Sequence, residues 1–288
     1  MRIRAGYRIS YDSPGPTPML LMLNVRPERL GDLEIPDTLT TDPNIPRHAY
    51  IDAFGNICTR LTAPAGRLTL FTAFVARDSG EPDPVLPHLM QHAVEDLPDP
   101  VIEYLLPSRY CELEHMNDLA WRLFGRTPPG WARVQAIVDY VHDRIRFGYE
   151  HARATKTAFE AHEEQAGVCR DYAHLAITLC RCLNIPARYC SGYLGDIGIP
   201  PIDAPMDFSA WFEVWLGGAW RTFDARHNTP RIARILMAVG RDATDVAITT
   251  AFGPNLLAGF KVVTEEIVTA DRRHDSPRDF APEARAFG

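Results

Sequence analysis

Apolar residues recur at steps of three and four between positions 168 and 183, a spacing that predicts a helix with one buried face. The residues of this stripe are Val168, Tyr172, Leu175, Ala176, Leu179, Cys182 and Leu183. The same spacing over residues 130–146 predicts a second helix, and a third is expected over residues 112–124. Pro186 ends the first helix, because proline cannot continue it. The middle of the chain is therefore expected to be helical.

The first 80 residues show a different pattern, in which short runs of β-branched, aromatic and leucine residues alternate with turn clusters. Strands are expected over residues 4–11, 19–27, 49–51, 56–62 and 67–76. This pattern predicts a small sandwich or open barrel. Strand patterns return after the helices, over residues 187–194 and in a hairpin around the turn Gly217-Gly218.

These patterns predict an α+β protein divided along the chain into four parts. We expect a β-rich N-terminal domain over residues 1–80, a proline-rich linker over 81–110 and a core domain over 111–270. A polar and flexible tail is expected over residues 271–288. A last strand, over residues 258–268, is assigned to the core domain.

Composition narrows the class of protein. Hydrophobic residues make up 46% of the 288 residues and charged residues 23%, as in soluble globular proteins. A net charge of −7 without a dense Lys/Arg cluster argues against a nucleic-acid partner. The N-terminus lacks the apolar run of a signal peptide, and no stretch reaches the ~18 apolar residues of a membrane span. We therefore expect a cytoplasmic protein without a membrane partner, with its six cysteines reduced.

Cys169 lies where the apolar helix begins, directly after Gly167-Val168. The free N–H groups and the dipole at a helix N-terminus stabilise negative charge, which favours a thiolate. A nucleophilic sulfur is one interpretation of this position. The alternative is a small apolar residue at a helix start, since free cysteine is commonly buried. No metal or cofactor is implied; His88 and His92 have the spacing of a helical metal pair but lack the glutamate of a zinc protease.

The register of the hairpin follows from its two-residue turn. The predicted pairs are Leu216 with Ala219, Trp211 with Asp224, and Ser209 with Arg226. Opposed residues share a face of the sheet, so Ser209, Trp211 and Asp224 are expected on one face. A base at position 209 and an orienting carboxylate at Asp224 would then be within reach of each other, as nucleophilic catalysis requires.

Four stretches in series resemble the bacterial transglutaminase-like superfamily, whose members have a papain-like Cys-His-Asp core. They are residues 167–173, 185–189, 210–215 and 220–228. The β-rich start resembles the N-terminal domain of one bacterial branch of that family. Together the two resemblances cover roughly residues 1–265. They imply a core in which the helix bearing Cys169 packs on an antiparallel sheet.

The resemblance implies that Cys169 is the nucleophile and Asp224 the carboxylate that orients an imidazole. The backbone N–H of Cys169 would stabilise the oxyanion. Members of the family commonly have histidine directly before the Ala-Trp of the first hairpin strand, but this chain has Ser209 there. A serine hydroxyl cannot act as a base near neutral pH, so the family mechanism does not transfer unchanged.

Several interpretations of Ser209 stay open. His227 is the leading substitute base, although hairpin parity places it on the face opposite Ser209, so a bulge or a chain bend is required. His174, on the Cys169 helix, and His162, before it, are weaker candidates. The enzyme could also work slowly without a strong base, or the cleft could bind without catalysis. A designed substitution at position 209 is compatible with the sequence as well.

The resemblance implies thiol acyl chemistry on an amide of a peptide or protein. Cys169 would attack the carbonyl and form a thioester that water or an amine resolves, as in a cysteine peptidase, an amidase or an acyl transferase. The alternative is a catalytically silent module that binds a peptide or protein partner. The oligomeric state does not follow from the sequence.

Overall fold

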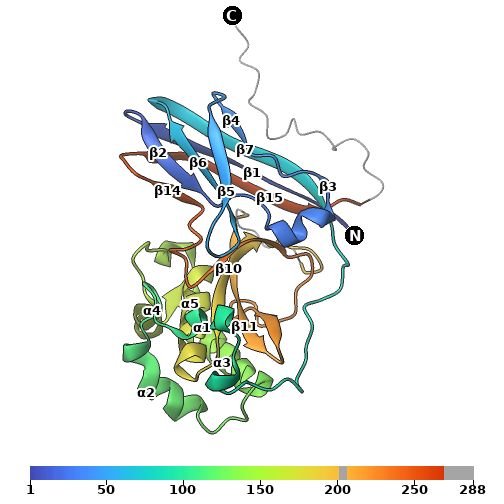
Figure 1. Cartoon of the computed structure of the whole chain (residues 1–288), viewed down its shortest axis with the longest axis vertical. Coiled ribbons are helices and arrows are strands. Elements are labelled where there is room, and N and C mark those ends of the chain that lie inside the picture. Colours follow the sequence, from blue (N-terminus) through green and yellow to red (C-terminus); the bar gives the residue numbers. More distant parts are fainter. Residues whose placement is uncertain (201–205, 269–288) are drawn as a thin grey trace, which may run out of the picture.

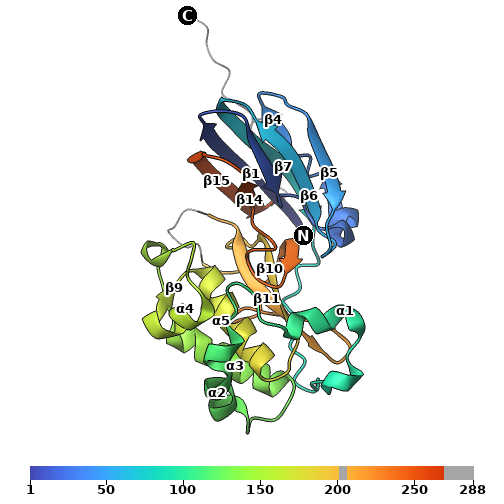
Figure 2. The same ribbon diagram turned by 60° about the vertical axis from the view of Figure 1, so that its left-hand side comes forward.

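The chain forms two lobes, one built of strands and one of helices and strands (Figures 1 and 2). They are seen in a computed structural model, which describes residues 1–200 and 206–268. The tail predicted over residues 271–288 lies outside the described residues. Within the described part of the chain, no helix has the length and apolarity that crossing a membrane requires.

The strand lobe is a sandwich of two antiparallel sheets. Its strands are β1 (Arg2–Ser13), β2 (Thr17–Leu21), β3 (Leu33–Ile35), β4 (Thr40–Asp42), β5 (Arg47–Ile51), β6 (Ile57–Ala63), β7 (Gly66–Arg77), β14 (Thr249–Ala251) and β15 (Leu256–Glu266). One sheet has the order β15-β1-β7-β3, with β4 also on β7, and the other has the order β14-β2-β6-β5. Alternate residues of β1, such as Ile3, Tyr7 and Ile9, are fully buried between the sheets. The period of two that predicts strands here thus also sets the sandwich core.

The last two described strands belong to this lobe, and not to the core domain predicted over residues 111–270. β15 pairs with β1, with Tyr7 opposite Val262, and β14 pairs with β2. The sequence indicates a strand near residues 258–268, but its partner is a long-range choice that local pattern does not specify. The chain therefore returns to complete the N-terminal sandwich after it has formed the other lobe. The exact domain limits stay a prediction.

The second lobe packs helices against one face of an antiparallel sheet. Its α-helices are α1 (Asp99–Ile102), α2 (Leu113–Phe124), α3 (Trp131–Arg144), α4 (Ala158–Glu164) and α5 (Cys169–Cys182). Its strands are β8 (Arg146–Phe147), β9 (Ala166–Gly167), β10 (Ala187–Tyr193), β11 (Ser209–Leu216), β12 (Ala219–Phe223) and β13 (Ile235–Gly240). Short 3₁₀ turns lie at Pro27–Asp32, Val94–Asp96, Glu103–Leu105 and Tyr149–His151. The main sheet has the order β12-β11-β10-β13, and the α+β class is confirmed.

Helix α5 is the centre of this lobe. Its apolar residues pack on β10 and β11, in one core cluster with Tyr189, Phe212 and Val214. The helix is buried on all sides, since every residue from Asp171 to Cys182 is buried and α2, α3 and α4 cover the remaining faces. The sequence predicts a single buried stripe, whereas tertiary packing encloses the whole helix. Cys169 at its first turn is the part that is not fully enclosed.

The hairpin of β11 and β12 has the predicted register beside its turn, but the predicted pairs Trp211–Asp224 and Ser209–Arg226 do not form, because β12 ends before them. Leu216 pairs with Ala219, and the pairing continues to Phe212 opposite Phe223. Both turn glycines have positive φ, 60° at Gly217 and 80° at Gly218, as the mirror-image two-residue turn requires. The paired residues end at Phe223, so Asp224 lies where the chain leaves the sheet.

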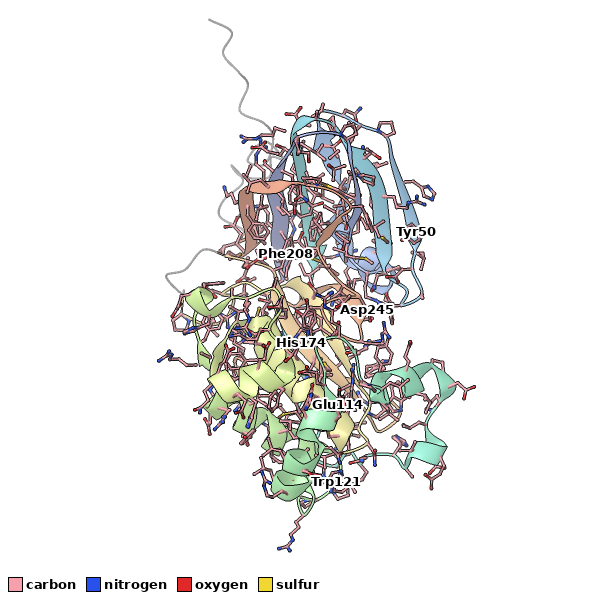
Figure 3. The ribbon with its side chains drawn as sticks, turned by 90° about the vertical axis from the view of Figure 1, so that its left-hand side faces the viewer. Tyr50, Glu114, Trp121, His174, Phe208 and Asp245 are labelled. Carbon is pink, nitrogen blue, oxygen red and sulfur yellow. The ribbon has the colours of Figure 1, made fainter. Side chains whose placement is uncertain are left out.

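Phe208 joins the two lobes (Figure 3). Its ring lies 6.0 Å from that of Tyr7, 5.2 Å from Tyr193 and 6.0 Å from Phe260, measured between centroids. It belongs to the same core cluster as the sandwich interior. The residue directly before Ser209 is therefore held by both lobes.

We expect Phe208→Ala to lower the free energy of unfolding by about 3 kcal/mol, because it removes a buried ring from a close-packed cluster. Urea denaturation followed by fluorescence measures the change. Phe252→Ala, which truncates a ring that is 62% exposed, is the matched control and should change stability by no more than about 0.5 kcal/mol. Equal stability of the two variants would show that Phe208 does not couple the lobes.

Candidate active site

Cys169 is presented by a tight junction between β9 and α5. The backbone N–H of Val168 donates a 2.9 Å hydrogen bond to Oδ2 of Asp171, one turn into the helix. A Cβ on Gly167 would lie 2.5 Å from that same oxygen, so only glycine allows the carboxylate to close the turn. The sequence Gly-Val-Cys-Arg-Asp thus sets the position of the thiol by local geometry.

The thiol lies in a groove of about 560 Å³ between the two lobes. The helical lobe contributes Tyr110, Val168, Tyr189 and Ala210, among others. The sandwich contributes Tyr11, Thr249, Leu257 and Phe260. Cys169 is half-buried, whereas the other five cysteines are buried. The groove is mostly apolar, and its volume lies in the range of ligand-binding clefts.

Burial raises the pKa of Cys169 above the usual value for a thiol. The positive charge of Arg226 and the backbone N–H of Ala210 act in the opposite direction, while Asp207 and Asp224 add to the increase. This net direction is opposite to the one predicted from the helix N-terminus alone. Desolvation between the lobes is the largest influence on the pKa of Cys169, and no hydrogen bond joins its sulfur to a histidine ring among the described residues. The resting thiol is therefore protonated near neutral pH.

Asp224 is a buried carboxylate with four hydrogen-bond donors around it. Its Oδ1 accepts bonds of 3.0 Å from the backbone N–H groups of Arg226 and His227. Its Oδ2 accepts from Nδ1 of His227 at 2.9 Å and from Nη2 of Arg234 at 3.0 Å. Burial opposes ionisation, but the His227 hydrogen bond and the Arg234 charge outweigh it and hold the pKa of Asp224 well below its usual range. The carboxylate is ionised and its four acceptor sites are filled.

His227 reaches Asp224 because the chain bends directly after β12. The backbone N–H of Asn228 donates to the carbonyl oxygen of Asp224 at 2.8 Å, which closes a turn over residues 224–228. This turn is the bend that the sequence requires for His227 to leave the face set by hairpin parity. With Nδ1 on Asp224, the other ring nitrogen makes no hydrogen bond within the described residues. The pair has the geometry in which a carboxylate orients an imidazole.

Ser209 lines both the groove that contains Cys169 and the smaller cavity that contains His227. It is buried at the first position of β11 and lines the Cys169 groove. It also lines a smaller cavity of about 60 Å³, whose other walls include His227 and Arg226. Its hydroxyl makes no hydrogen bond within the described part of the chain. Three consecutive residues, Asp207, Phe208 and Ser209, are thus shared between the groove and the small cavity.

The two weaker histidine candidates have other partners. His174 is enclosed between the rings of Tyr110 and Tyr189, at 4.9 and 5.1 Å, and its Nε2 accepts from the N–H of Ala243. Burial lowers the pKa of His174 to about 3, so its ring stays neutral. His162 contacts Tyr140 through Nδ1 at 3.3 Å. Neither ring lines the Cys169 groove.

Sequence reasoning misses the residues that support Asp224 from other elements. Arg234 connects Asp224 to Asp83 in the predicted linker, through a 2.8 Å bond from its Nε. Arg226 is the main positive charge acting on Cys169, and Asp207 lines both cavities. Two of these residues carry a sequence signal: Asp207 lies two residues before Ser209, and Arg226 is the partner of Ser209 in the predicted register. No group of three or more His, Cys, Asp or Glu side chains able to hold a metal occurs among residues 1–200 and 206–268.

Comparison with known proteins agrees with this architecture. The model of the transglutaminase-like superfamily matches residues 118–225, which contain Cys169, Ser209 and Asp224. The chain is similar to the uncharacterised protein ML0607 of Mycobacterium leprae, with 28% identity over 220 residues, or 72% of this chain and 76% of that protein. It is also similar to a solved structure from Cytophaga hutchinsonii described as a "Putative Cysteine Protease". That match has 31% identity and a TM-score of 0.79, and it covers 93% of this chain and 91% of the other.

The chain belongs to the transglutaminase-like superfamily. This membership and the similar structure support a cysteine-based enzyme or a binding module in general. Neither identifies the group that would take the proton of Cys169 in place of a histidine at position 209.

We expect iodoacetamide to label Cys169 before the other five cysteines, since those are buried. Because the pKa of Cys169 is raised, the labelling rate should rise about tenfold per pH unit and show no plateau below pH 9. Arg226→Gln should slow the reaction several-fold, as it removes the main charge that favours the thiolate. Peptide mass spectrometry measures the rates, with Arg126→Gln, an exposed arginine outside the groove, as the control. A plateau below pH 8 would contradict this account.

We expect Asp224→Asn to reduce stability at pH 7 by about 3 kcal/mol, because Arg234 loses a buried partner. The folded-state pKa of Asp224 is lowered, so its ionised form stabilises the fold above the unfolded pKa of about 4. That contribution is lost as pH falls below 4 towards the folded-state value. Urea denaturation at pH 7 and pH 3 should therefore show a larger acid loss for the unchanged chain than for the variant. Equal losses would mean that Asp224 is not held ionised by the fold.

Proposed function

We propose that this protein performs thiol acyl chemistry on peptide amides, with Cys169 as nucleophile and the His227–Asp224 pair as base. The observation that carries the proposal is the 2.9 Å bond between His227 Nδ1 and an ionised Asp224, beside a cavity that shares Ser209 with the Cys169 groove. In this assignment His227 takes the role that the family commonly gives to a histidine at position 209. Ser209 leaves room for that exchange.

The proposed reaction starts from a neutral thiol, so attack and proton transfer are coupled. The sulfur of Cys169 bonds to the carbonyl carbon while its proton passes to the free nitrogen of His227. The small cavity of about 60 Å³ has room for a water that would relay the proton past the Ser209 hydroxyl. The imidazolium then protonates the leaving amine as the C–N bond breaks. Water or a second amine resolves the thioester and regenerates the thiol.

The surroundings of the groove support two further assignments. The backbone N–H of Cys169, at the start of α5, would donate to the oxyanion of the tetrahedral intermediate. The aromatic and aliphatic walls, among them Tyr11, Tyr189 and Phe260, favour a peptide with apolar side chains near the scissile amide. Hydrolysis and transamidation use the same first half-reaction and differ only in the acceptor.

A catalytically silent binding module is the second candidate function. It is favoured by the raised pKa of Cys169 and by the lack of a hydrogen bond between its sulfur and any described imidazole. In that case the groove would hold a peptide without cleaving it. The two candidates differ in whether a covalent acyl intermediate forms on Cys169.

The decisive experiment compares acyl transfer by four forms of the full chain. They are the unchanged protein, Cys169→Ala, His227→Ala, and His227→Ala combined with Ser209→His. A tryptic peptide mixture with a fluorescent primary amine as acceptor reports transamidation, and new peptide termini report hydrolysis. We expect activity that needs Cys169, falls about 10²- to 10⁴-fold in His227→Ala, and recovers in part in the double variant. The recovery is expected because removal of His227 frees Oδ2 of Asp224 for a histidine at position 209.

Other outcomes would contradict either the role of His227 or the enzymatic function. Activity that is unaffected by His227→Ala would remove His227 from the mechanism. An inactive natural chain that binds peptides, together with an active double variant, would establish the silent module. Circular dichroism of each variant separates loss of activity from loss of folding.

A further inference from the structure

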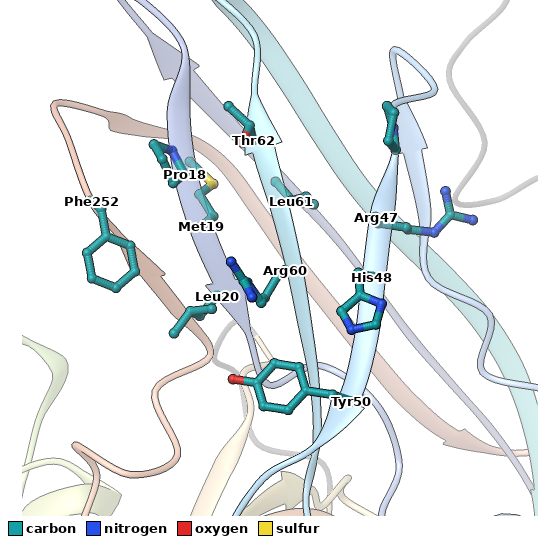
Figure 4. A pocket seen from close by; sticks show the side chains of 11 residues that line it. Pro18, Met19, Leu20, Arg47, His48, Tyr50, Arg60, Leu61, Thr62 and Phe252 are labelled. Carbon is teal, nitrogen blue, oxygen red and sulfur yellow. The ribbon is translucent and has the colours of Figure 1, made fainter.

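A second open groove lies on the sandwich, separate from the Cys169 groove. It has a volume of about 960 Å³ and is bounded by β2, β5 and β6 together with Phe252 (Figure 4). None of its lining residues lines the Cys169 groove. Its chemistry therefore does not depend on the acyl-transfer proposal.

The floor of this groove is a row of opposed residues across three strands. Arg60 of β6 pairs with Leu20 of β2 on one side and with His48 of β5 on the other. Figure 4 shows Arg60 beside Leu20 and above the ring of Tyr50, with Phe252 on the far side of Leu20; the two aromatic residues are 37% and 62% exposed. The exposed guanidinium of Arg60 thus lies on the floor of the groove with apolar side chains beside it.

The groove is cationic in a protein of net charge −7. Arg47 and Arg60 line it, together with His48 and without any Asp or Glu. Neither arginine makes a hydrogen bond or ion pair within the described residues, whereas Arg67 on the same lobe is paired with Asp12 at 2.7 Å. These two unpaired guanidinium groups lie on opposite faces of the sheet, with Arg47 directed away from Arg60 across β5 (Figure 4), and each offers forked N–H donors that match carboxylates.

The groove also adjoins an open backbone edge. β5 is the last strand of its sheet and, among residues 1–200 and 206–268, pairs only with β6. All five of its residues are exposed, and the side chains of Arg47 and His48 project to opposite faces of the sheet. An edge strand of this kind accepts an added strand through its free N–H and C=O groups. A free inorganic anion would use the guanidinium groups but not this edge.

We propose that this groove docks an extended acidic peptide segment of a partner protein. The segment adds to the free edge of β5 by backbone pairing. Its alternate side chains then lie on the two faces of the sheet, one set beside Arg47 and the other beside His48 and Arg60. Carboxylates on both sets bind the two guanidinium groups, which gives the site its selectivity for an acidic partner.

The test measures binding of a fluorescein-labelled decapeptide, in which pairs of adjacent glutamates alternate with pairs of threonines, to the full chain by fluorescence anisotropy. Adjacent glutamates place carboxylates on both faces of an added strand. A glutamine-for-glutamate peptide and an N-methylated acidic peptide remove the charge and the backbone donors separately. We expect Arg60→Glu and Arg47→Glu each to weaken binding at least tenfold, and added salt to weaken it further. Arg126→Glu makes the same charge change outside the groove and should alter the affinity less than twofold. Both altered peptides should bind at least tenfold more weakly.

Contrary results separate the parts of the proposal. Equal binding of the glutamine peptide, or no effect of Arg60→Glu, would overturn the acidic site. Full affinity of the N-methylated peptide would overturn strand addition at β5. Competition by inorganic phosphate or a short oligonucleotide as strong as by the peptide would show a general anion site instead. Arg60→Gln, checked by circular dichroism, gives a second variant if the charge reversal disturbs folding.

Discussion

The buried carboxylate of Asp224 is the interaction on which the arrangement of the candidate site depends. It closes the turn after β12, orients the His227 ring and forms an ion pair with Arg234. Arg234 in turn bonds Asp83, so the segment between the lobes is tied to the same point. A carboxylate buried this deeply is stable only because four donors replace its lost hydration. Loss of any one of them would leave a buried charge incompletely compensated.

The closure of the two lobes sets the protonation state of the thiol. A helix N-terminus stabilises a negative charge by only about 0.3–1 kcal/mol when exposed. At Cys169 the sandwich strands β14 and β15 help to cover the groove, and the resulting desolvation dominates. The thiol of Cys169 therefore stays protonated in the resting protein, and nucleophilic chemistry there requires a base that accepts the proton during attack. The proposed function assigns this base to the Asp224–His227 pair.

Local pattern predicts the elements of this site better than their surroundings. The register of the hairpin follows from the Gly217-Gly218 turn, and the start of α5 follows from the apolar spacing around Cys169. The path of His227 is harder to predict, because strand parity stops applying where β12 ends at Phe223. An Asp side chain commonly accepts hydrogen bonds from backbone N–H groups two and three residues later, which forms a turn. Asp224 does so, and its presence in the sequence therefore indicates a turn after β12.

Tertiary partners were beyond prediction for a physical reason. Nothing in the spacing of Arg234 or Asp83 indicates that they meet at Asp224, since both come from segments without regular periodicity there. The pairing of β15 with β1 is likewise a choice among many available edges. The class of fold could be predicted because each element carries its own pattern, but contacts between distant elements depend on how the whole chain packs.

The serine at position 209 and the bend at His227 are complementary features. Both acceptor sites of Asp224 Oδ2 are used, one by His227 and one by Arg234, so a histidine at position 209 would have no free oxygen to bind. Serine is small enough to leave the adjoining cavity open and does not compete for the carboxylate. Replacement of the usual residue therefore need not signal a lost site. Serine at position 209 is the residue expected if the Asp224 carboxylate already orients the His227 imidazole, which approaches it from the turn after β12.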